Sequence, residues 1–379
     1  MENINNDVKV VDVRMLGAHD AFSGSISYMS RSNVNEGGIV NNGAVNHLAK
    51  GLVVRMSKAQ KNNAKELLYN GVRYFDARIT KINDDYYTYH GYLSNSLEFY
   101  LIDIIDFLET HPTEFIIFDI QEFYTKNGSD NNLPNEDWDN LLLEMSEIKN
   151  SNGKTILDFI NYDAKEDSLS SLTVGKITNN KTIGGIIMLA KTNSYSEFYL
   201  RDSNADKDNE RIYSSIRSYW HNKNSHKDML EGIEAEYDFN KQLDYQDIFI
   251  VNQAQKTAFI LDASIFRSLF SWSLIDMAAS FNKELVSDKE RFMRWLDEMP
   301  IFMVDFATSS RGDFNNKANQ YIMEYNNNLW WIILMIWLRG RALKQSLLLQ
   351  YPYFLAIFSN NYIIQSILWL LGTFWERML

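Results

Sequence analysis

The chain has 379 residues, of which 45% are hydrophobic and 14% aromatic, a composition that excludes an intrinsically disordered protein. Its formal net charge of −12 opposes binding to the phosphate backbone of nucleic acid, so no nucleic-acid partner is expected. Because the chain contains no cysteine, disulfides and thiolate metal sites are also excluded.

The first residues, MENINNDVKVVDVRM, contain no basic segment followed by an apolar one. We therefore expect no secretory signal peptide, and either a cytoplasmic location or export by another route. A peripheral membrane location is compatible with both.

Short β-branched or aromatic segments alternate with longer amphipathic ones between Val8 and Phe306, a pattern typical of repeated βα units. A helix is predicted at Ser96–His111, where apolar residues recur at helical spacing before Pro112. The sequence therefore predicts an α/β fold. The predicted strands are Val8–Leu16, Tyr74–Ile79, Tyr86–Tyr89, Phe115–Ile120, Ile183–Leu189, Ile248–Asn252 and Ile301–Phe306.

The last part of the chain, 327–379, differs in composition and contains five of the nine tryptophans. Its longest uninterrupted apolar run, Leu329–Leu338, has ten residues, half of the ~20 that a membrane-spanning helix needs. We expect a globular domain over 1–326 followed by an apolar helical extension. This extension could be a hairpin at a membrane surface, or a helix pair packed on the domain or on another subunit.

Two of the six histidines come directly after predicted strands: His19 in LGAHDAFSGS and His90 in YYTYHGYLSNS. In a βα barrel, residues at the C-terminal strand ends face the active site, because the loops converge there. In the segment GVRYFDARIT, strand alternation places Asp76 and Arg78 on one face. A buried carboxylate and guanidinium need each other or a ligand, so these side chains are either a structural ion pair or part of the same site.

These segments resemble the X domain of phosphatidylinositol-specific phospholipases C, in the same order and at similar spacing. The residues that carry the resemblance are LGAHDAFSGS, GVRYFDARI, YHG and FLETHPTEFIIFDIQEFY. It continues more weakly through GKITNNKTIGGIIMLAK, DIFIVNQAQKT and MPIFMVDFA and ends near Asn326. The resemblance implies a TIM-like (β/α)₈ barrel over 1–326. It also implies cleavage of a phosphatidylinositol-like phospholipid at a membrane surface to diacylglycerol and a (cyclic) inositol phosphate.

Carried over position by position, the resemblance makes His19 the general base and His90 the general acid. Arg78 matches the arginine that stabilises negative charge on the phosphate oxygens. Asp20 matches the aspartate beside the base histidine. Asp76 matches the acid two residues before that arginine and is assigned to substrate binding.

Other site residues follow from the same comparison. Asp305, in the last predicted strand, would adjoin the first strand in a closed barrel and resembles the aspartate that orients the base. Lys191 and Gln253, at predicted strand ends, are expected to contact the headgroup. Gln121 is assigned to substrate binding too, although calcium-dependent relatives have a glutamate there and bacterial ones a lysine.

Family members that require calcium have an acidic residue in place of Arg78 and an asparagine in place of Asp20. The resemblance is therefore to the bacterial, metal-independent type, and it implies neither a metal nor a cofactor. The sequence contains no glycine-rich phosphate loop or dinucleotide fingerprint either.

Two other functions remain open. A metal-dependent glycerophosphodiesterase or sphingomyelinase D-like barrel would share the architecture and the paired histidines, but would hold a divalent ion with acidic ligands. An inactive barrel whose tail binds a membrane or a partner protein is the second, and Gln121 in place of a charged residue supports it. No particular protein partner is predicted.

Overall fold

The computed structural model describes residues 1–36, 43–164, 166–190, 212–213, 216–242, 248–257 and 273–328. Within the chain, Met1–Asn327 forms one compact unit and Asn328–Leu379 a second. All of the predicted apolar extension from residue 329 onward lies outside the described residues, as does Lys191. The extension's helical character and its boundary at 327 therefore remain predictions.

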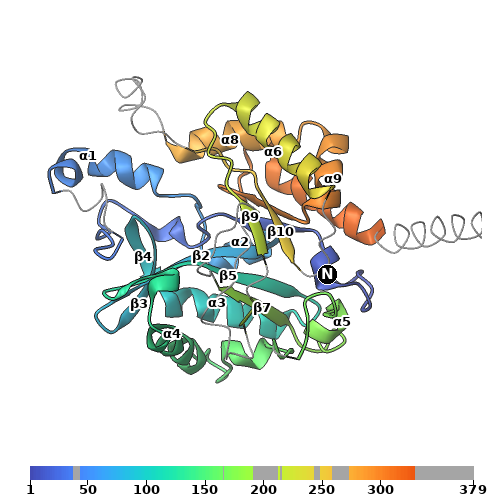
Figure 1. Cartoon of the computed structure of the whole chain (residues 1–379), viewed down its shortest axis with the longest axis horizontal. Helices are drawn as coiled ribbons and strands as arrows, with labels where there is room; N and C mark the ends of the chain where they lie inside the picture. The colour runs from blue at the N-terminus through green and yellow to red at the C-terminus, as the bar shows by residue number, and fades with distance from the viewer. Residues whose placement is uncertain are drawn as a thin grey trace, which may run out of the picture. The chain divides into compact units, whose positions relative to one another are not determined.

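A curled sheet of parallel strands forms the centre of the first unit, and its strands are neighbours in chain order (Figure 1). The first strand pairs with the last, Met15 lying opposite Ile301. Among the described residues, no ladder joins β8 to β9. The strands of this path are β1 (Met15–Ala18), β2 (Val72–Ile82), β5 (Phe115–Thr125), β7 (Gly185–Ala190), β8 (Ile212–Tyr213), β9 (Ile216–Tyr219), β10 (Phe249–Gln253) and β11 (Ile301–Val304).

The predicted α/β barrel-like architecture is confirmed, and most predicted strands occur within a few residues of their expected bounds. The strand predicted at Val8–Leu16 is wrong in its first half. Residues there form the 3₁₀ helix η1 (Val10–Asp12), and the strand begins only at Met15. The reason is tertiary: Val10 N donates to Leu172 O at 2.9 Å, outside the sheet.

Three strands lie off the parallel path. β3 (Asp85–His90) runs antiparallel to the end of β2, and β4 (Tyr92–Ser96) pairs with β3. β6 (Gly128–Ser129) pairs with the end of β5. The long strand β2 and this antiparallel arm carry His90 to the carboxyl end of the barrel.

Helices lie on the outer side of the curled sheet: in Figure 1, α3 lies below β5 and β7, and α6, α8 and α9 gather above β9 and β10. No helix in the described part of the chain is long and apolar enough to cross a bilayer. The α-helices are α1 (Gly43–Met56), α2 (Ala64–Tyr69), α3 (Leu97–Thr110), α4 (Asn135–Glu147), α5 (Val174–Ile177), α6 (His226–Asn240), α8 (Leu274–Leu285) and α9 (Lys289–Glu298). The remaining 3₁₀ helices are η2 (Ser23–Ser25), η4 (Asp130–Asn132), η5 (Ile156–Phe159) and η6 (Arg311–Asp313).

The helix predicted at Ser96–His111 is confirmed as α3, whose ends match that range to within one residue. Ser96 is its N-cap and accepts a hydrogen bond from Phe99 N, which satisfies one of the unpaired amides of the first turn. The apolar face of α3 is buried, with Leu101 and Ile104 fully inaccessible to solvent. Burial of this face is what holds the helix against the sheet.

The outer face of β11 packs on the helix layer. The ring of Phe302 lies 4.5 Å from that of Phe292 and 6.2 Å from that of Trp295, both in α9. Because side chains alternate along a strand, the next residue, Met303, faces the barrel interior. Asp305 lies two residues further along and belongs to this inner side.

Gly17 of β1 is the neighbour of Met303 on the inner face. A Cβ atom at Gly17 would lie only 2.9 Å from Tyr74 Cδ1 and 3.2 Å from Met303 Cα. The absence of a side chain here lets the interior close beneath His19, which follows two residues later on the same face.

We expect Gly17→Ala to lower the free energy of unfolding by about 1–3 kcal/mol, because the added methyl overpacks the interior. The matched control is Gly51→Ala in α1, where the new Cβ would meet nothing closer than Tyr28 at 4.0 Å. That control should raise stability by up to about 1 kcal/mol, the difference between alanine and glycine in a helix. Urea denaturation of both variants checks the prediction, which fails if Gly17→Ala is as stable as the wild type.

Candidate active site

The end of β1 delivers two of the predicted site residues. His19 N donates to Val304 O at 3.1 Å, which continues the β1–β11 pairing by one residue. Asp20 then adopts a left-handed backbone with φ of 41°, and its side chain is completely buried. This conformation is uncommon for a residue with a side chain, and it ends the strand between the two groups.

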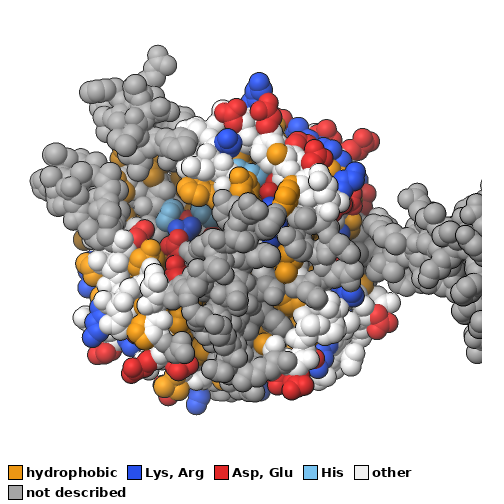
Figure 2. All heavy atoms as spheres, viewed as in Figure 1, with side chains coloured by type: hydrophobic (Ala, Val, Ile, Leu, Met, Phe, Trp, Pro, Cys, Tyr) orange, Lys and Arg blue, Asp and Glu red, His pale blue; other side chains and the backbone are white. Residues whose placement is uncertain are grey.

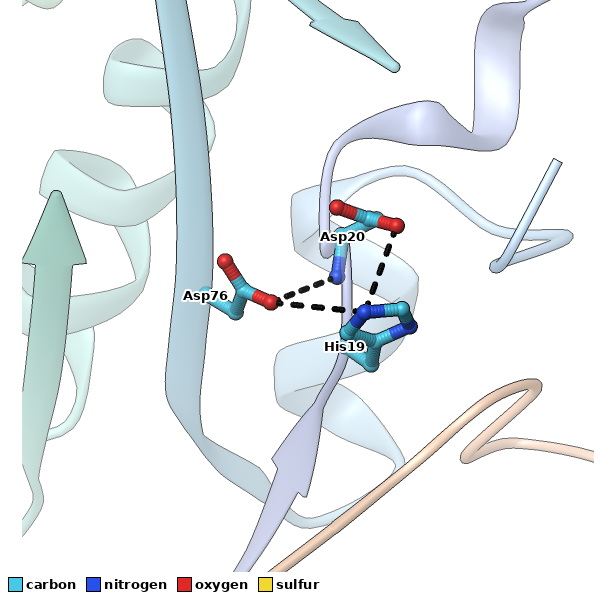
Figure 3. Close-up of side chains that lie close together, drawn as sticks. All are labelled: His19, Asp20 and Asp76. Atoms are coloured by element: carbon cyan, nitrogen blue, oxygen red, sulfur yellow. Dashed lines mark hydrogen bonds and ion pairs between the residues drawn. The ribbon is translucent and has the colours of Figure 1, made fainter. Parts of the chain in front are cut away.

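Asp76 and Arg78 lie on β2 beside this turn, as the alternation predicted. Asp76 Oδ2 accepts a hydrogen bond from Asp20 N at 3.2 Å and lies 3.9 Å from His19 Nε2. Figure 3 shows the side chains of His19, Asp20 and Asp76 pointing toward one another from the two strands. The strand neighbours β1 and β2 therefore bring these groups together.

Arg78 lies among three carboxylates. Its Nε contacts Asp20 Oδ1, and the same nitrogen lies 4.0 Å from Asp76 Oδ1. Its Nη1 lies 3.5 Å from Glu122 Oε1. Its Nη2 lies 3.5 Å from His19 Nε2. The guanidinium is thus fixed beside the imidazole, with one-fifth of the side chain still exposed to solvent.

Asp305 orients His19. Its Oδ1 lies 2.7 Å from His19 Nδ1, and only 3% of the Asp305 side chain is exposed. A carboxylate at this distance accepts the Nδ1 proton, which leaves the lone pair of the neutral imidazole on Nε2. The nitrogen that could exchange a proton with a ligand is therefore the one beside Arg78.

His90 enters from the antiparallel arm. Its Nδ1 lies 2.8 Å from Ser57 O and 3.1 Å from Asp20 Oδ2. Both neighbours are oxygens that accept, so Nδ1 carries a proton and Nε2 is the second exchangeable position. The rings of His19 and His90 have centroids 6.3 Å apart and meet at 73°.

The two imidazoles and Arg78 keep some access to solvent, with side-chain exposures of 16%, 26% and 20% for His19, His90 and Arg78. The carboxylates behind them, Asp20 and Asp76, are buried. On the face shown in Figure 2, histidine, basic and acidic side chains gather in one small open area. A ligand would meet the nitrogen groups first, and the acids would act through them.

The surroundings shift the pKa values of the two histidines in opposite directions. Burial works against a charged imidazole at His19, but the carboxylates of Asp20 and Asp305 outweigh it and raise the pKa of His19 to about 9. Burial lowers the pKa of His90, and the attraction of the Asp20 carboxylate does not compensate for it. In the ligand-free protein at neutral pH, His19 is therefore the positively charged imidazole and His90 is neutral.

The pKa values of the three buried carboxyl groups also shift in different directions. Burial would raise the pKa of Asp20, but Arg78 and the histidines hold it below its usual value. Burial raises the pKa of Asp76 to about 6, although Arg78 opposes the shift. Burial likewise raises the pKa of Asp305, against the pull of His19.

The residues predicted to contact the headgroup bond to neighbouring protein groups or lie outside the described residues. Gln121 faces the interior, but its Nε2 donates to Asp119 Oδ2 at 2.8 Å, so the side chain is tied to the barrel wall. Gln253 Nε2 donates to Ser218 Oγ at 2.7 Å. The substrate contacts assigned to both residues remain predictions, and Lys191 lies outside the described residues.

Some site groups were missed by the sequence reasoning. Glu122 contacts Arg78, and its Oε2 accepts from Tyr89 OH at 2.9 Å. Strict alternation along β5 puts Gln121 inward and Glu122 outward, but the register shifts between Ala77 and Arg78 where β5 pairs with β2. A bulge of this kind redirects a side chain and leaves no mark in the sequence.

His19, Asp20 and Asp76 also form a group that could hold a metal ion, because each offers a ligand atom within 4.8 Å of the others. The donor set of one imidazole and two carboxylates suits a divalent ion. However, Arg78 already contacts Asp20 and adjoins His19 Nε2. An ion bound here would lie against the positive charge of Arg78, so the site fits a metal poorly although its donor atoms suit one.

No family model matches the chain. It is 29% identical over 128 residues to the mouse "PI-PLC X domain-containing protein 2", a match that covers 33% of this chain and 38% of that protein. It is 37% identical over 87 residues to the "Variant-surface-glycoprotein phospholipase C" of Trypanosoma brucei brucei, covering 22% of this chain and 24% of that protein. The matches thus span less than half of these relatives.

The fold is similar to that of the phosphatidylinositol-specific phospholipase C of Staphylococcus aureus, with a TM-score of 0.56 and 13% identity. That alignment covers 86% of this chain and 95% of the staphylococcal one. At this identity the likeness shows the fold alone. The sequence matches make the chain a homologue of the mouse PI-PLC X domain-containing protein and of the trypanosome phospholipase C over a third of its length or less.

Proposed function

We propose that the protein is a metal-independent phosphodiesterase that cleaves a phosphatidylinositol-like phospholipid at a membrane surface. The observation that carries the proposal is the pair of imidazoles, His19 and His90, with ring centroids 6.3 Å apart and Arg78 beside His19. Two proton-exchanging groups and a guanidinium facing one opening are what an in-line displacement at phosphorus needs.

The proposed reaction assigns one task to each nitrogen group. His19 Nε2 removes the proton from a hydroxyl of the headgroup, whose oxygen attacks phosphorus. His90 Nε2 gives a proton to the departing glycerol oxygen. Arg78 donates to the phosphoryl oxygens as charge accumulates on them. The products are diacylglycerol and a cyclic inositol phosphate, which water can open later with the two histidines in exchanged roles.

The carboxylates support these groups in the proposal. Asp305 holds His19 in the tautomer that has its lone pair on Nε2. Asp20 connects Arg78 to both histidines, and Asp76 fixes the backbone of Asp20. Gln121, Gln253 and Lys191 are assigned to the headgroup, and the 327–379 extension to contact with a membrane or another subunit.

Substituting either histidine should abolish turnover without unfolding the protein. On phosphatidylinositol vesicles, His19→Ala and His90→Ala are each expected to lower kcat about 10²–10⁴-fold, the usual size of one general acid or base contribution. His226→Ala is the control, since His226 lies in α6 and bonds Ser280 at 3.1 Å. Release of diacylglycerol is measured, with phosphatidylcholine vesicles as the substrate control. Wild-type rates in either site variant would remove the assigned roles.

The rate should depend on pH as a bell, because a base must be neutral while an acid is protonated. Since the pKa of His19 is higher than that of His90, the active form, with neutral His19 and protonated His90, is a minor one across the plateau, and the higher pKa sets the alkaline limb. The alkaline limb of kcat/KM should therefore lie near 9, the value to which the pKa of His19 is raised. Asp305→Asn removes one of the carboxylates that raise it, so the alkaline limb should move to lower pH. Asp276→Asn, whose carboxylate pairs with Arg311 instead, should leave the limb in place. An unmoved limb in Asp305→Asn contradicts the assignment of the base.

Chelation separates the proposal from its metal-dependent alternative, which the His19, Asp20 and Asp76 group keeps open. We expect that EDTA leaves the rate unchanged and that added Ca²⁺ or Mg²⁺ does not increase it, because the positive charge of Arg78 already balances the buried carboxylates. The measurement is the initial rate before and after exhaustive dialysis against chelator. A rate that falls to background and returns with a divalent ion would favour a glycerophosphodiesterase or sphingomyelinase D-like chemistry.

A further inference from the structure

A four-residue segment between α1 and α2, Ser57–Gln60, touches both candidate catalytic histidines. The carbonyl oxygen of Ser57 accepts from His90 Nδ1 at 2.8 Å. Three residues later, Gln60 Nε2 donates to the carbonyl oxygen of His19 at 2.9 Å. No strand of the barrel contributes this segment, and nothing in its sequence indicates chemistry.

Gln60 is fully buried, and its side-chain amide bridges two strand ends. Besides His19 O, its Nε2 donates to Val304 O at 3.0 Å, and its Oε1 accepts from Ala307 N at 3.0 Å. Val304 and Ala307 lie on either side of Asp305. One amide therefore joins the backbone that carries the base to the backbone that carries its carboxylate partner.

The bridge is held rigidly. Ser23 Oγ accepts hydrogen bonds from Ala59 N at 3.0 Å and from Gln60 N at 3.1 Å. Ala59 O accepts from Phe306 N at 2.7 Å, and Phe306 has a left-handed backbone with φ of 50°. Each partner of the segment is thus fixed from a second side, so Gln60 transmits its position to both strand ends.

We propose that Gln60 is a positioning residue for the reaction described above: its carboxamide sets the spacing between the ends of β1 and β11 and so holds His19 against Asp305. That this positioning matters for catalysis rests on the proposed function. The physical basis is that a hydrogen bond weakens steeply as its two atoms move apart, here His19 Nδ1 and Asp305 Oδ1 at 2.7 Å. A shorter or apolar side chain leaves the His19 carbonyl and the Ala307 amide without these hydrogen bonds, while Val304 O keeps only the bond from His19 N. The strand ends can then separate.

The chain offers a matched control at the other end of the same strand. Asn326 Nδ2 donates to Arg14 O at 2.8 Å, and Asn326 Oδ1 accepts from Arg14 N at 2.9 Å. This amide also ties β1 to a neighbouring segment, but at the end of the barrel opposite the site. A purely structural role would make the two amides equivalent.

The experiment compares Gln60→Met, which keeps length and loses the hydrogen bonds, with Asn326→Leu. In Gln60→Met we expect kcat on phosphatidylinositol vesicles to fall on the order of 100-fold with little change in KM, the effect of a misplaced catalytic group. The pKa of the His19 imidazole, followed by NMR titration, should fall from about 9 toward the usual 6.5 as Asp305 moves away. Asn326→Leu should change neither quantity.

A Gln60→Met protein with unchanged kcat and an unchanged pKa of His19 overturns the proposal, as does an equal loss in Asn326→Leu. If Gln60→Met does not fold, Ser23→Ala decides instead, because it loosens the segment without altering the amide and should shift both quantities in the same direction by less. If the wild type cleaves no phospholipid, the proposed function fails. The titration of His19 still tests the positioning role, since it needs no substrate.

Discussion

The buried carboxylate of Asp20 is the interaction on which the site depends. Its side chain has no exposure to solvent, and it contacts Arg78, His19 and His90 together. A buried charge without partners is strongly unfavourable, and removal of one member of such a group costs about 3–5 kcal/mol. The three nitrogen groups come from β1, β2 and the antiparallel arm, so a single anion ties together segments distant in the chain.

The backbone reaches this arrangement through two unusual strand ends. β1 ends at a left-handed Asp20, and β11 is followed by a left-handed Phe306. Both residues follow directly after a member of the His19 and Asp305 pair, so both strands turn sharply as soon as they have delivered a functional side chain. Conformations of this kind persist only where surrounding contacts hold them. Gln60 supplies such a contact by donating to His19 O, and Asn282 supplies another by donating to Asp305 O at 2.8 Å.

Strand-end reasoning for His19, and side-chain alternation for Asp76 and Arg78, predicted these residues correctly as neighbours, because adjacent parallel strands of a barrel bring their inward side chains to one place. It also placed Asp305 beside His19, since the first and last strands of a barrel must pair. It could not find Glu122, which reaches Arg78 only through a register shift, or Gln60, which lies in a loop. Local periodicity also failed at Val8–Asp12, where hydrogen bonds to a distant loop prevail over β propensity.

The distribution of protons suggests how a phosphodiester completes the site. Without ligand, His19 is the more basic imidazole, and His90 is neutral because burial outweighs the pull of Asp20. A general acid needs the opposite state at His90. In the proposed reaction a phosphodiester binds beside His90 and Arg78 and brings a negative charge there, and an anion beside His90 favours the protonated imidazole. The substrate itself would then charge the acid that the proposed reaction uses, so the acid form is most populated where there is a leaving group to protonate.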